Sequence, residues 1–173
     1  MGVLVRRATV DDARALAVVH VRAWQAAYRG AMPDAYLDAL SVSDRTAWWR
    51  ETLGADPGPS QPTTFVGLAG AEIGGFVVVG PCSDETVADR ASQLWALNLD
   101  PPRWGTGLAD ALIGEGTEHL QALGRPEAVL WVVESNARAR RFYERHGWAP
   151  DGARTTADLG GFEVEEVRYR RSL

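Results

Sequence analysis

Apolar residues follow two kinds of pattern along the chain, and together they predict a mixture of strands and helices. Short runs rich in apolar and β-branched residues are typical of strands, and they cover 3–6, 64–69, 73–79, 93–99 and 128–133. Apolar residues at helical spacing predict helices, over 13–27, 34–40, 44–53, 108–123 and 137–146. A closing hairpin is expected from strands at 153–158 and 163–170 that turn at Gly160-Gly161.

This order of elements predicts the fold class. One strand, several helices, three strands, a helix, a strand, a helix and two strands indicate an α/β (α+β) fold with a mixed central β-sheet flanked by helices. The run 128–133 is apolar throughout, which favours a strand buried on both faces. The segment 54–62 is rich in Gly and Pro and is expected to be a loop. Too little chain precedes this loop to form a core, so we expect a single domain over residues 1–173.

Charge and composition exclude several classes of function. The chain has 173 residues, 18 Lys and Arg against 23 Asp and Glu, and a formal net charge of −5, so no basic excess favours nucleic acid or an anionic membrane. The single cysteine, Cys82, excludes an internal disulfide and a cysteine cluster, and no histidine or carboxylate spacing indicates a metal site. No apolar run reaches the ~18 residues that span a bilayer, and none near the start indicates a signal peptide. We therefore expect a cytoplasmic protein.

A glycine-rich turn stands between a predicted strand and a predicted helix, at 97–109. Gly105 and Gly107 let the backbone approach a ligand closely, and the first N–H groups of the following helix lack partners within it. Such donors, with the positive end of the helix dipole, suit a pyrophosphate. No Lys-Ser/Thr follows the glycines, which excludes a P-loop. The turn also lies past mid-chain, unlike the dinucleotide fingerprint at the first strand of its fold.

A second segment, 132–148, contains a short helix with two distinct faces. Ser135 or Asn136 can cap its start. One face is aromatic and apolar, with Ala139, Phe142, Tyr143 and His146. Basic residues gather beside it: Arg138, Arg140, Arg141 and Arg145. Taken alone, core packing explains the aromatic residues and solvation explains the arginines.

Together, the two segments resemble the GNAT-type N-acetyltransferase superfamily. Its cofactor loop reads Gln/Arg-x-x-Gly-x-Gly/Ala, and its second motif reads Asn-x-x-Ala-x-x-Phe-Tyr-x-x-x-Gly-Phe. The corresponding residues here are Trp104 to Ala109 in the loop, then Asn136, Ala139, Phe142, Tyr143, Gly147 and Trp148. The resemblance implies transfer of an acetyl group from acetyl-CoA to a primary amine of a small molecule by direct attack. Two alternatives stay open, namely acetylation of a protein N-terminus or lysine and a non-catalytic acyl-CoA-binding module.

The resemblance also implies roles for individual residues. Leu97 would offer an N–H to the thioester carbonyl, Asn136 would hold the pantetheine arm, and Tyr143 would protonate the leaving thiolate; these three are the expected catalytic residues. The strand that carries Val132 and Val133 would diverge to leave a slot for the pantetheine. The expected cofactor-binding residues are Leu97, Asn98, Leu99, Arg103, Trp104, Gly105, Thr106, Gly107, Leu108, Ala109, Asn136, Ala139, Phe142 and Tyr143.

Two positions depart from the family's pattern. Trp104 stands at the first loop position instead of Gln or Arg, so phosphate binding is expected to depend on backbone N–H groups, with Arg103 as a helper. Gln93 stands near the position where many relatives carry a glutamate that serves as general base. An amide cannot take up a proton at neutral pH, so that base is absent or lies elsewhere.

The acceptor side is less clearly marked. The candidate substrate-binding residues are Trp24, Tyr28, Trp95 and Glu134. Trp24 and Tyr28 lie four residues apart on one helix face and serve equally well as core aromatics. Glu134 could attract a cationic amine or be a solvated carboxylate at a helix start. The aromatic and apolar stretch 24–40 favours a small enclosed pocket, hence a small molecule over a protein, and the closing strands offer an interface for a homodimer.

Overall fold

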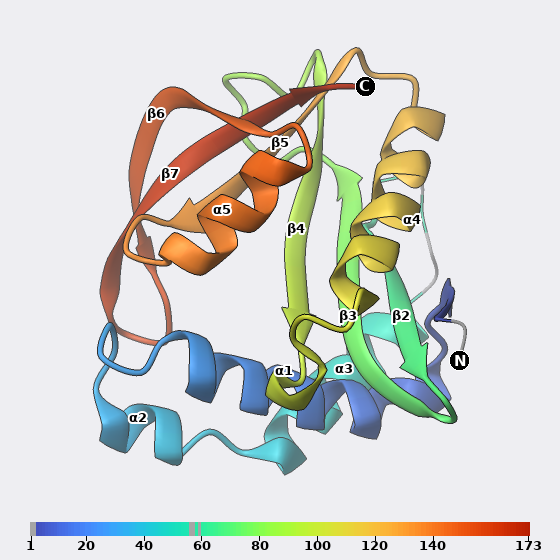
Figure 1. The fold of residues 1–173 in the computed structure, drawn as a ribbon, viewed down its shortest axis with the longest axis vertical. Coiled ribbons are helices and arrows are strands. Elements are labelled where there is room, and N and C mark those ends of the chain that lie inside the picture. Colours follow the sequence, from blue (N-terminus) through green and yellow to red (C-terminus); the bar gives the residue numbers. More distant parts are fainter. Residues whose placement is uncertain (1–2, 56–57, 59) are drawn as a thin grey trace.

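A computed structural model describes residues 3–55, 58 and 60–173, and its elements follow the predicted order (Figure 1). Residues 56, 57 and 59 of the expected loop 54–62 lie outside the described residues. The helices are α1 (Ala13–Ala27), α2 (Asp34–Asp38), α3 (Val42–Gly54), α4 (Leu108–Ala122) and α5 (Ala137–Arg145), with 3₁₀ turns at Val10–Asp12 and Pro101–Arg103. The strands are β1 (Leu4–Arg7), β2 (Thr63–Ala69), β3 (Glu72–Pro81), β4 (Ala91–Leu99), β5 (Glu127–Val133), β6 (Ala149–Asp158) and β7 (Glu163–Ser172). None of the helices so described is long and apolar enough to cross a membrane.

Several boundaries differ from the prediction by a few residues, and two of these differences have a local reason. α3 begins two residues early because the Ser41 hydroxyl accepts a hydrogen bond from the Asp44 N–H, at 3.1 Å, and so caps the helix. β6 begins four residues early, although Pro150 lies within it. Proline is tolerated there because β6 is an edge strand and its register with β7 shifts between Pro150 and Arg154.

All seven strands form one sheet in the order β1-β2-β3-β4-β5-β7-β6. Neighbouring strands are antiparallel except β4 and β5, which run parallel and are connected through α4. Helices cover both faces, so the predicted α/β (α+β) fold with a mixed central sheet is confirmed.

The core has two layers, one on each face of the sheet. Val77 and Val79 of β3 are fully buried with Leu112 of α4, in a layer that α5 also joins. Phe76, the residue before Val77, is buried on the other face with Trp49 of α3 and the apolar side of α1. Each such side chain stabilises the folded protein by about 1.5–3 kcal/mol when it is buried. Packing in the two layers therefore holds the sheet, and with it the strand ends, in a fixed position.

The sheet opens between β4 and β5, which pair only from Ala91 opposite Glu127 to Gln93 opposite Val129. Beyond these positions the two strands diverge (Figure 1). Trp95 is an extra residue on β4, because Val78 pairs with residue 96 and the next residue of β3 pairs with residue 94. A bulge of this kind bends its strand. The bend at Trp95 explains why β4 separates from the part of β5 that carries Val132 and Val133, as the sequence resemblance implied.

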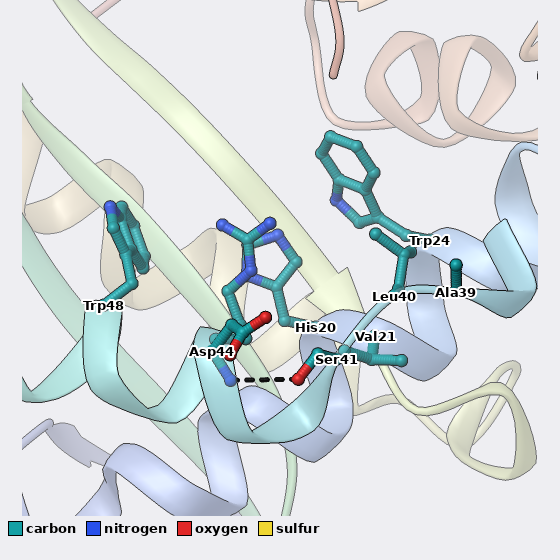
Figure 2. A pocket seen from close by; sticks show the side chains of 9 residues that line it. His20, Val21, Trp24, Ala39, Leu40, Ser41, Asp44 and Trp48 are labelled. Atoms are coloured by element: carbon teal, nitrogen blue, oxygen red, sulfur yellow. Dashed lines mark hydrogen bonds between the residues drawn. The ribbon is translucent and has the colours of Figure 1, made fainter. Parts of the chain in front are cut away.

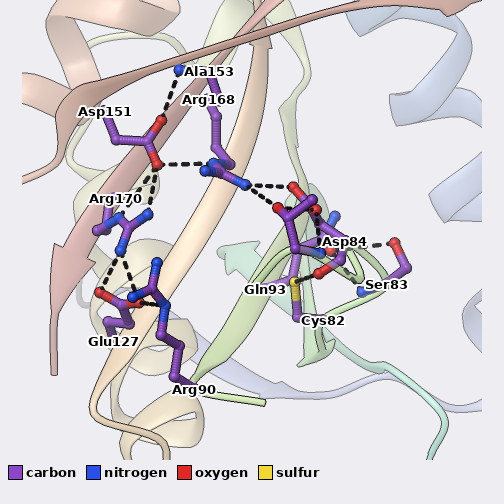
Figure 3. Close-up of polar contacts among 11 residues, drawn as sticks. Cys82, Ser83, Asp84, Arg90, Gln93, Glu127, Asp151, Ala153, Arg168 and Arg170 are labelled. Carbon is purple, nitrogen blue, oxygen red and sulfur yellow. Dashed lines mark hydrogen bonds and ion pairs between the residues drawn. The ribbon is translucent and has the colours of Figure 1, made fainter. Parts of the chain in front are cut away.

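A network of ion pairs holds the closed end of this opening (Figure 3). Arg168 of β7 donates to Asp84 at 2.6 Å and to Asp151 at 2.8 Å. Arg170 donates to Asp151 and to Glu127, each at 2.9 Å. Burial acts to raise the pKa of Asp151, but its hydrogen bonds outweigh burial and hold the pKa below its usual value. The strands are therefore fixed at one end and separated at the other.

Candidate active site

A cleft of about 560 Å³ lies at the opening between β4 and β5. It brings together many of the residues expected to bind the cofactor, namely Leu97, Asn98, Leu99, Trp104, Gly105, Ala109, Asn136, Ala139, Phe142 and Tyr143. Its other lining residues are Ala23, Ala26 and Ala27 of α1 and Arg138, Arg141 and Arg145 of α5. Residues from four separate stretches of the chain thus meet at one cavity.

Backbone N–H groups of β4 face this cleft. The Asp100 N–H donates to the Gly74 carbonyl at 2.9 Å, so this pair is a hydrogen-bonded position of the β3–β4 ladder. Hydrogen-bonded and non-bonded pairs alternate along an antiparallel ladder, so Leu99, and Leu97 opposite Val77, occupy non-bonded positions. Their N–H groups point away from β3 and toward the opening, where β5 no longer pairs. These groups can donate to a carbonyl oxygen or an oxyanion.

The glycine turn before α4 presents further donors. Gly105 and Gly107 have φ values of 73° and 85°, in the left-handed region that favours glycine. No heavy atom lies within 4 Å of where a Cβ of either residue would stand, so packing does not require glycine there. Helix geometry leaves the N–H groups of Leu108 and Ala109 without partners inside α4, and together with the helix dipole they suit an anion. Of the predicted loop residues, Thr106, Gly107 and Leu108 belong to this turn without lining the cleft.

The cation beside this turn does not come from the loop. Arg103 forms an ion pair with Glu72 at 3.2 Å, and its side chain runs along Gly74, which keeps it out of the cleft. Instead, the guanidinium of Arg138 on α5 stacks over the Trp104 ring, 3.5 Å from the ring centre. The tryptophan in the unusual loop position thus supports an arginine that lies 34 positions later in the sequence.

The arginines on α5 separate into two groups. Arg138, Arg141 and Arg145 line the cleft. Arg140 donates to the Tyr169 hydroxyl at 3.0 Å and to the Glu134 carbonyl at 3.1 Å, so it ties α5 to the sheet. Sequence spacing could not separate these roles, because they depend on what faces each side of the helix.

Asn136 and Tyr143 both line the cleft from α5. The side-chain Oδ1 of Asn136 accepts from the Ala139 N–H at 3.1 Å and caps the helix, which leaves the side-chain NH₂ as a donor. Tyr143 is only 7% exposed, and burial, followed by the nearby Tyr28, raises its pKa well above the ordinary value. Within the described part of the chain its hydroxyl has no hydrogen-bond partner, yet it is not sealed from the cleft. It therefore remains protonated and can donate a proton.

The candidate acceptor residues are more dispersed. Trp24 lines a separate cavity of about 340 Å³, where His20 lies between Trp24 and Trp48 (Figure 2). Tyr28 contacts Trp24 edge-on, with the ring centres 5.1 Å apart. Trp95 lines a third cavity of about 490 Å³, and its indole N–H donates to the Pro81 carbonyl.

Glu134 and Gln93 do not line the cleft. The Glu134 carboxylate is ion-paired with Arg154, so its charge is already compensated, and it does not line the cleft. The Gln93 side-chain oxygen accepts from the Ser83 N–H at 3.1 Å, which gives this residue a structural role.

Burial, and then the positive charge of Arg45, lower the pKa of His20 to about 3, so this histidine is neutral and a weak base.

A mixed sheet that opens between two parallel strands, beside a helix that begins after a glycine turn, defines the acyl-CoA N-acyltransferase fold of the GNAT type. The model of the Acetyltransferase (GNAT) family matches residues 21–148, and the chain belongs to this family. The protein is accordingly an acetyltransferase.

Individual relatives agree with this assignment. The chain is 28% identical over 169 residues to "Uncharacterized N-acetyltransferase YuaI" of Bacillus subtilis (strain 168). The alignment covers 95% of the present chain and 90% of the relative. The fold of the present chain matches the crystal structure of the PaiA N-acetyltransferase from Thermoplasma acidophilum in complex with coenzyme A. The TM-score is 0.73, the sequence identity is 16%, and the match covers both chains in full. It also matches YncA, a putative acetyltransferase from Salmonella typhimurium with its cofactor acetyl-CoA, with a TM-score of 0.71, 15% identity and coverage of 99% and 94%.

Proposed function

We propose that the protein transfers an acetyl group from acetyl-CoA to a primary amine of a small molecule by direct attack. The observation that carries this proposal is the continuity of the cleft from the glycine turn at Gly105 to the Tyr143 hydroxyl. One end offers unpaired N–H donors for phosphate, and the other offers a proton donor for a leaving thiolate. The neighbours solved with coenzyme A and acetyl-CoA support the choice of cosubstrate.

The cosubstrate would lie along β4 with its pyrophosphate at the glycine turn. The N–H groups of the first turn of α4 would donate to the phosphates, and Arg138, supported by Trp104, would supply the positive charge that the loop itself lacks. The amide NH₂ of Asn136 would hold the pantetheine arm. This arrangement replaces the family's loop side chain with an arginine from another helix.

The chemistry would need two further groups. The N–H of Leu97 would stabilise the oxyanion that forms when the amine attacks the thioester carbonyl. The intermediate would then collapse as the C–S bond breaks. Tyr143 would give its proton to the thiolate sulfur and regain one from the nitrogen, which becomes an amide.

A free-thiol release assay with acetyl-CoA tests this proposal. The panel contains small primary amines, a peptide with a free N-terminus and a peptide with an internal lysine. Turnover with small amines supports the proposal. Turnover confined to the peptides would replace it with protein acetylation, and tight acetyl-CoA binding without turnover would replace it with a binding module.

A further inference from the structure

Glu166 of β7 is a half-buried carboxylate beside the open end of β5. It pairs with Val133 of β5 and with Thr155 of β6, and directly opposite residues share a face. Its neighbours Val167 and Tyr169 are buried on the other face, in the layer that contains Tyr143 of α5. The Glu166 side chain therefore points to the face that α1 covers, at the last paired position of β5, where the sheet has opened.

The C-terminal end of α1 lies at this edge of the sheet. Figure 1 shows it below the loop that joins β6 and β7, and the rings of Tyr36 on α2 and Phe162 in that loop are in contact, with centres 5.0 Å apart. Tyr28 caps α1 at this end. Burial, and then the negative charge of Glu166, raise the pKa of Tyr28 to about 12, and Tyr28 in turn raises the pKa of Tyr143. Ala27, next to Tyr28, lines the cleft together with Tyr143, so this end of α1 lies beside the opening of the sheet.

No side chain in the described part of the chain binds these three polar groups. In the part of the chain that the structure describes, no hydrogen-bond or ion-pair partner is found for the Tyr28 hydroxyl, the Tyr143 hydroxyl or the Glu166 carboxylate. None of the three groups is sealed from solvent. Burial raises the pKa of Glu166, and no described side chain forms an ion pair with it to offset this effect. Polar side chains that are partly desolvated and unpaired are unusual in structural positions.

The nearby cations are engaged elsewhere. Arg168 shares the face of Glu166 but binds Asp84 and Asp151. Arg29, next to Tyr28, binds Asp38 at 2.9 Å and also Asp34 of α2. A positive group that reaches Glu166 would therefore meet a carboxylate whose charge no described side chain compensates.

We propose that Glu166 is the general base of the reaction, and that the acceptor binds as an ammonium ion between the Glu166 carboxylate and the Tyr28 ring. This assignment rests on the proposed function and fills the role that Gln93 cannot. The carboxylate takes one proton from the ammonium, and the nitrogen lone pair so released forms the bond to the thioester carbon. Tyr143 then protonates the sulfur as the C–S bond breaks and takes the second proton from the nitrogen, which becomes an amide. The acceptor class is accordingly a small amine that is cationic at neutral pH.

A pair of amines of similar shape tests the assignment. Ethylamine is cationic at neutral pH, whereas the fluorines of 2,2,2-trifluoroethylamine keep most of it neutral. Single-turnover acetyl transfer to each is measured at saturating acetyl-CoA. Glu166→Gln is expected to slow transfer to ethylamine by about 10²–10³-fold, within the usual range for general bases, and transfer to trifluoroethylamine by less than about threefold. The deficit with ethylamine should shrink as the pH rises toward that amine's own pKa, and acetyl-CoA affinity should not change.

Glu165→Gln is the matched control. Glu165 is the adjacent carboxylate, but it is exposed and accepts a hydrogen bond from the Thr156 hydroxyl at 2.7 Å, so the variant should behave like the wild type. Equal losses for both amines, or no loss for either, would overturn the role of Glu166 and leave the proposed function standing. Acetyl-CoA binding without transfer to any amine by the wild type would overturn both.

Discussion

Replacing Arg138 with alanine is expected to weaken coenzyme A binding by about 10- to 150-fold. Its guanidinium lies 3.5 Å from the centre of the Trp104 ring and lines the cleft beside Gly105. A charge-assisted hydrogen bond contributes about 1.5–3 kcal/mol, and each 1.4 kcal/mol corresponds to a factor of ten in affinity. One such bond to the pyrophosphate accounts for the stated range.

Trp104→Ala should have a smaller effect, of about 2- to 30-fold, because it removes only the support of the guanidinium. A cation–π contact of this kind contributes about 0.5–2 kcal/mol. The two substitutions should not be additive, since Trp104 has nothing to hold once Arg138 is gone. In the Arg138→Ala background, Trp104→Ala should therefore change the affinity by less than about twofold.

Isothermal titration calorimetry with three ligands checks this reasoning. Coenzyme A and dephospho-coenzyme A should show the same loss in Arg138→Ala, and pantetheine, which has no phosphate, should show none. Arg140→Ala is the control on the same helix, because Arg140 binds Tyr169 and Glu134 instead of lining the cleft. Unchanged affinity in Arg138→Ala, or full additivity with Trp104→Ala, would refute the pairing. A loss confined to coenzyme A would move the contact to the 3′-phosphate.

Three further outcomes are expected. Gly107→Val should weaken coenzyme A by about 2 kcal/mol or more in the same titration, because φ is 85° and the side chain blocks close approach, whereas Gly114→Val within α4 should not. Tyr143→Phe should slow single-turnover transfer by about 10²–10⁴-fold with little change in coenzyme A affinity; a normal rate would make this tyrosine structural. The folded-state pKa of His20 is about 3, below the unfolded value of 6.5, so its contribution to stability is complete above pH 6.5 and declines as the pH falls toward 3. Between pH 7 and 5 the loss is about 2 kcal/mol, and urea titrations should show it in the wild type but not in His20→Phe.

Local sequence determined the elements of this protein and their order. Hydrophobic periodicity depends on residues a few positions apart, so it located the strands and helices before any contact between them was known. The strand at 128–133 shows this, since its uninterrupted apolar run corresponds to Ala128, Val129 and Leu130 at 0% exposure. The glycine turn and the cap at Asn136 could be recognised for the same reason, because both are determined by neighbouring residues.

The tertiary structure decided which side chains meet. Arg103 and Arg138 are both basic residues near a phosphate-binding motif, yet one pairs with Glu72 and the other stacks on Trp104. Glu134 and Glu166 are both carboxylates at the open end of β5, but only Glu134 has a cationic partner among the described residues. Such differences depend on strand register and on the packing of helices that are far apart in sequence. A one-residue change of register would turn Glu166 to the opposite face, so no pattern along the chain could assign its role.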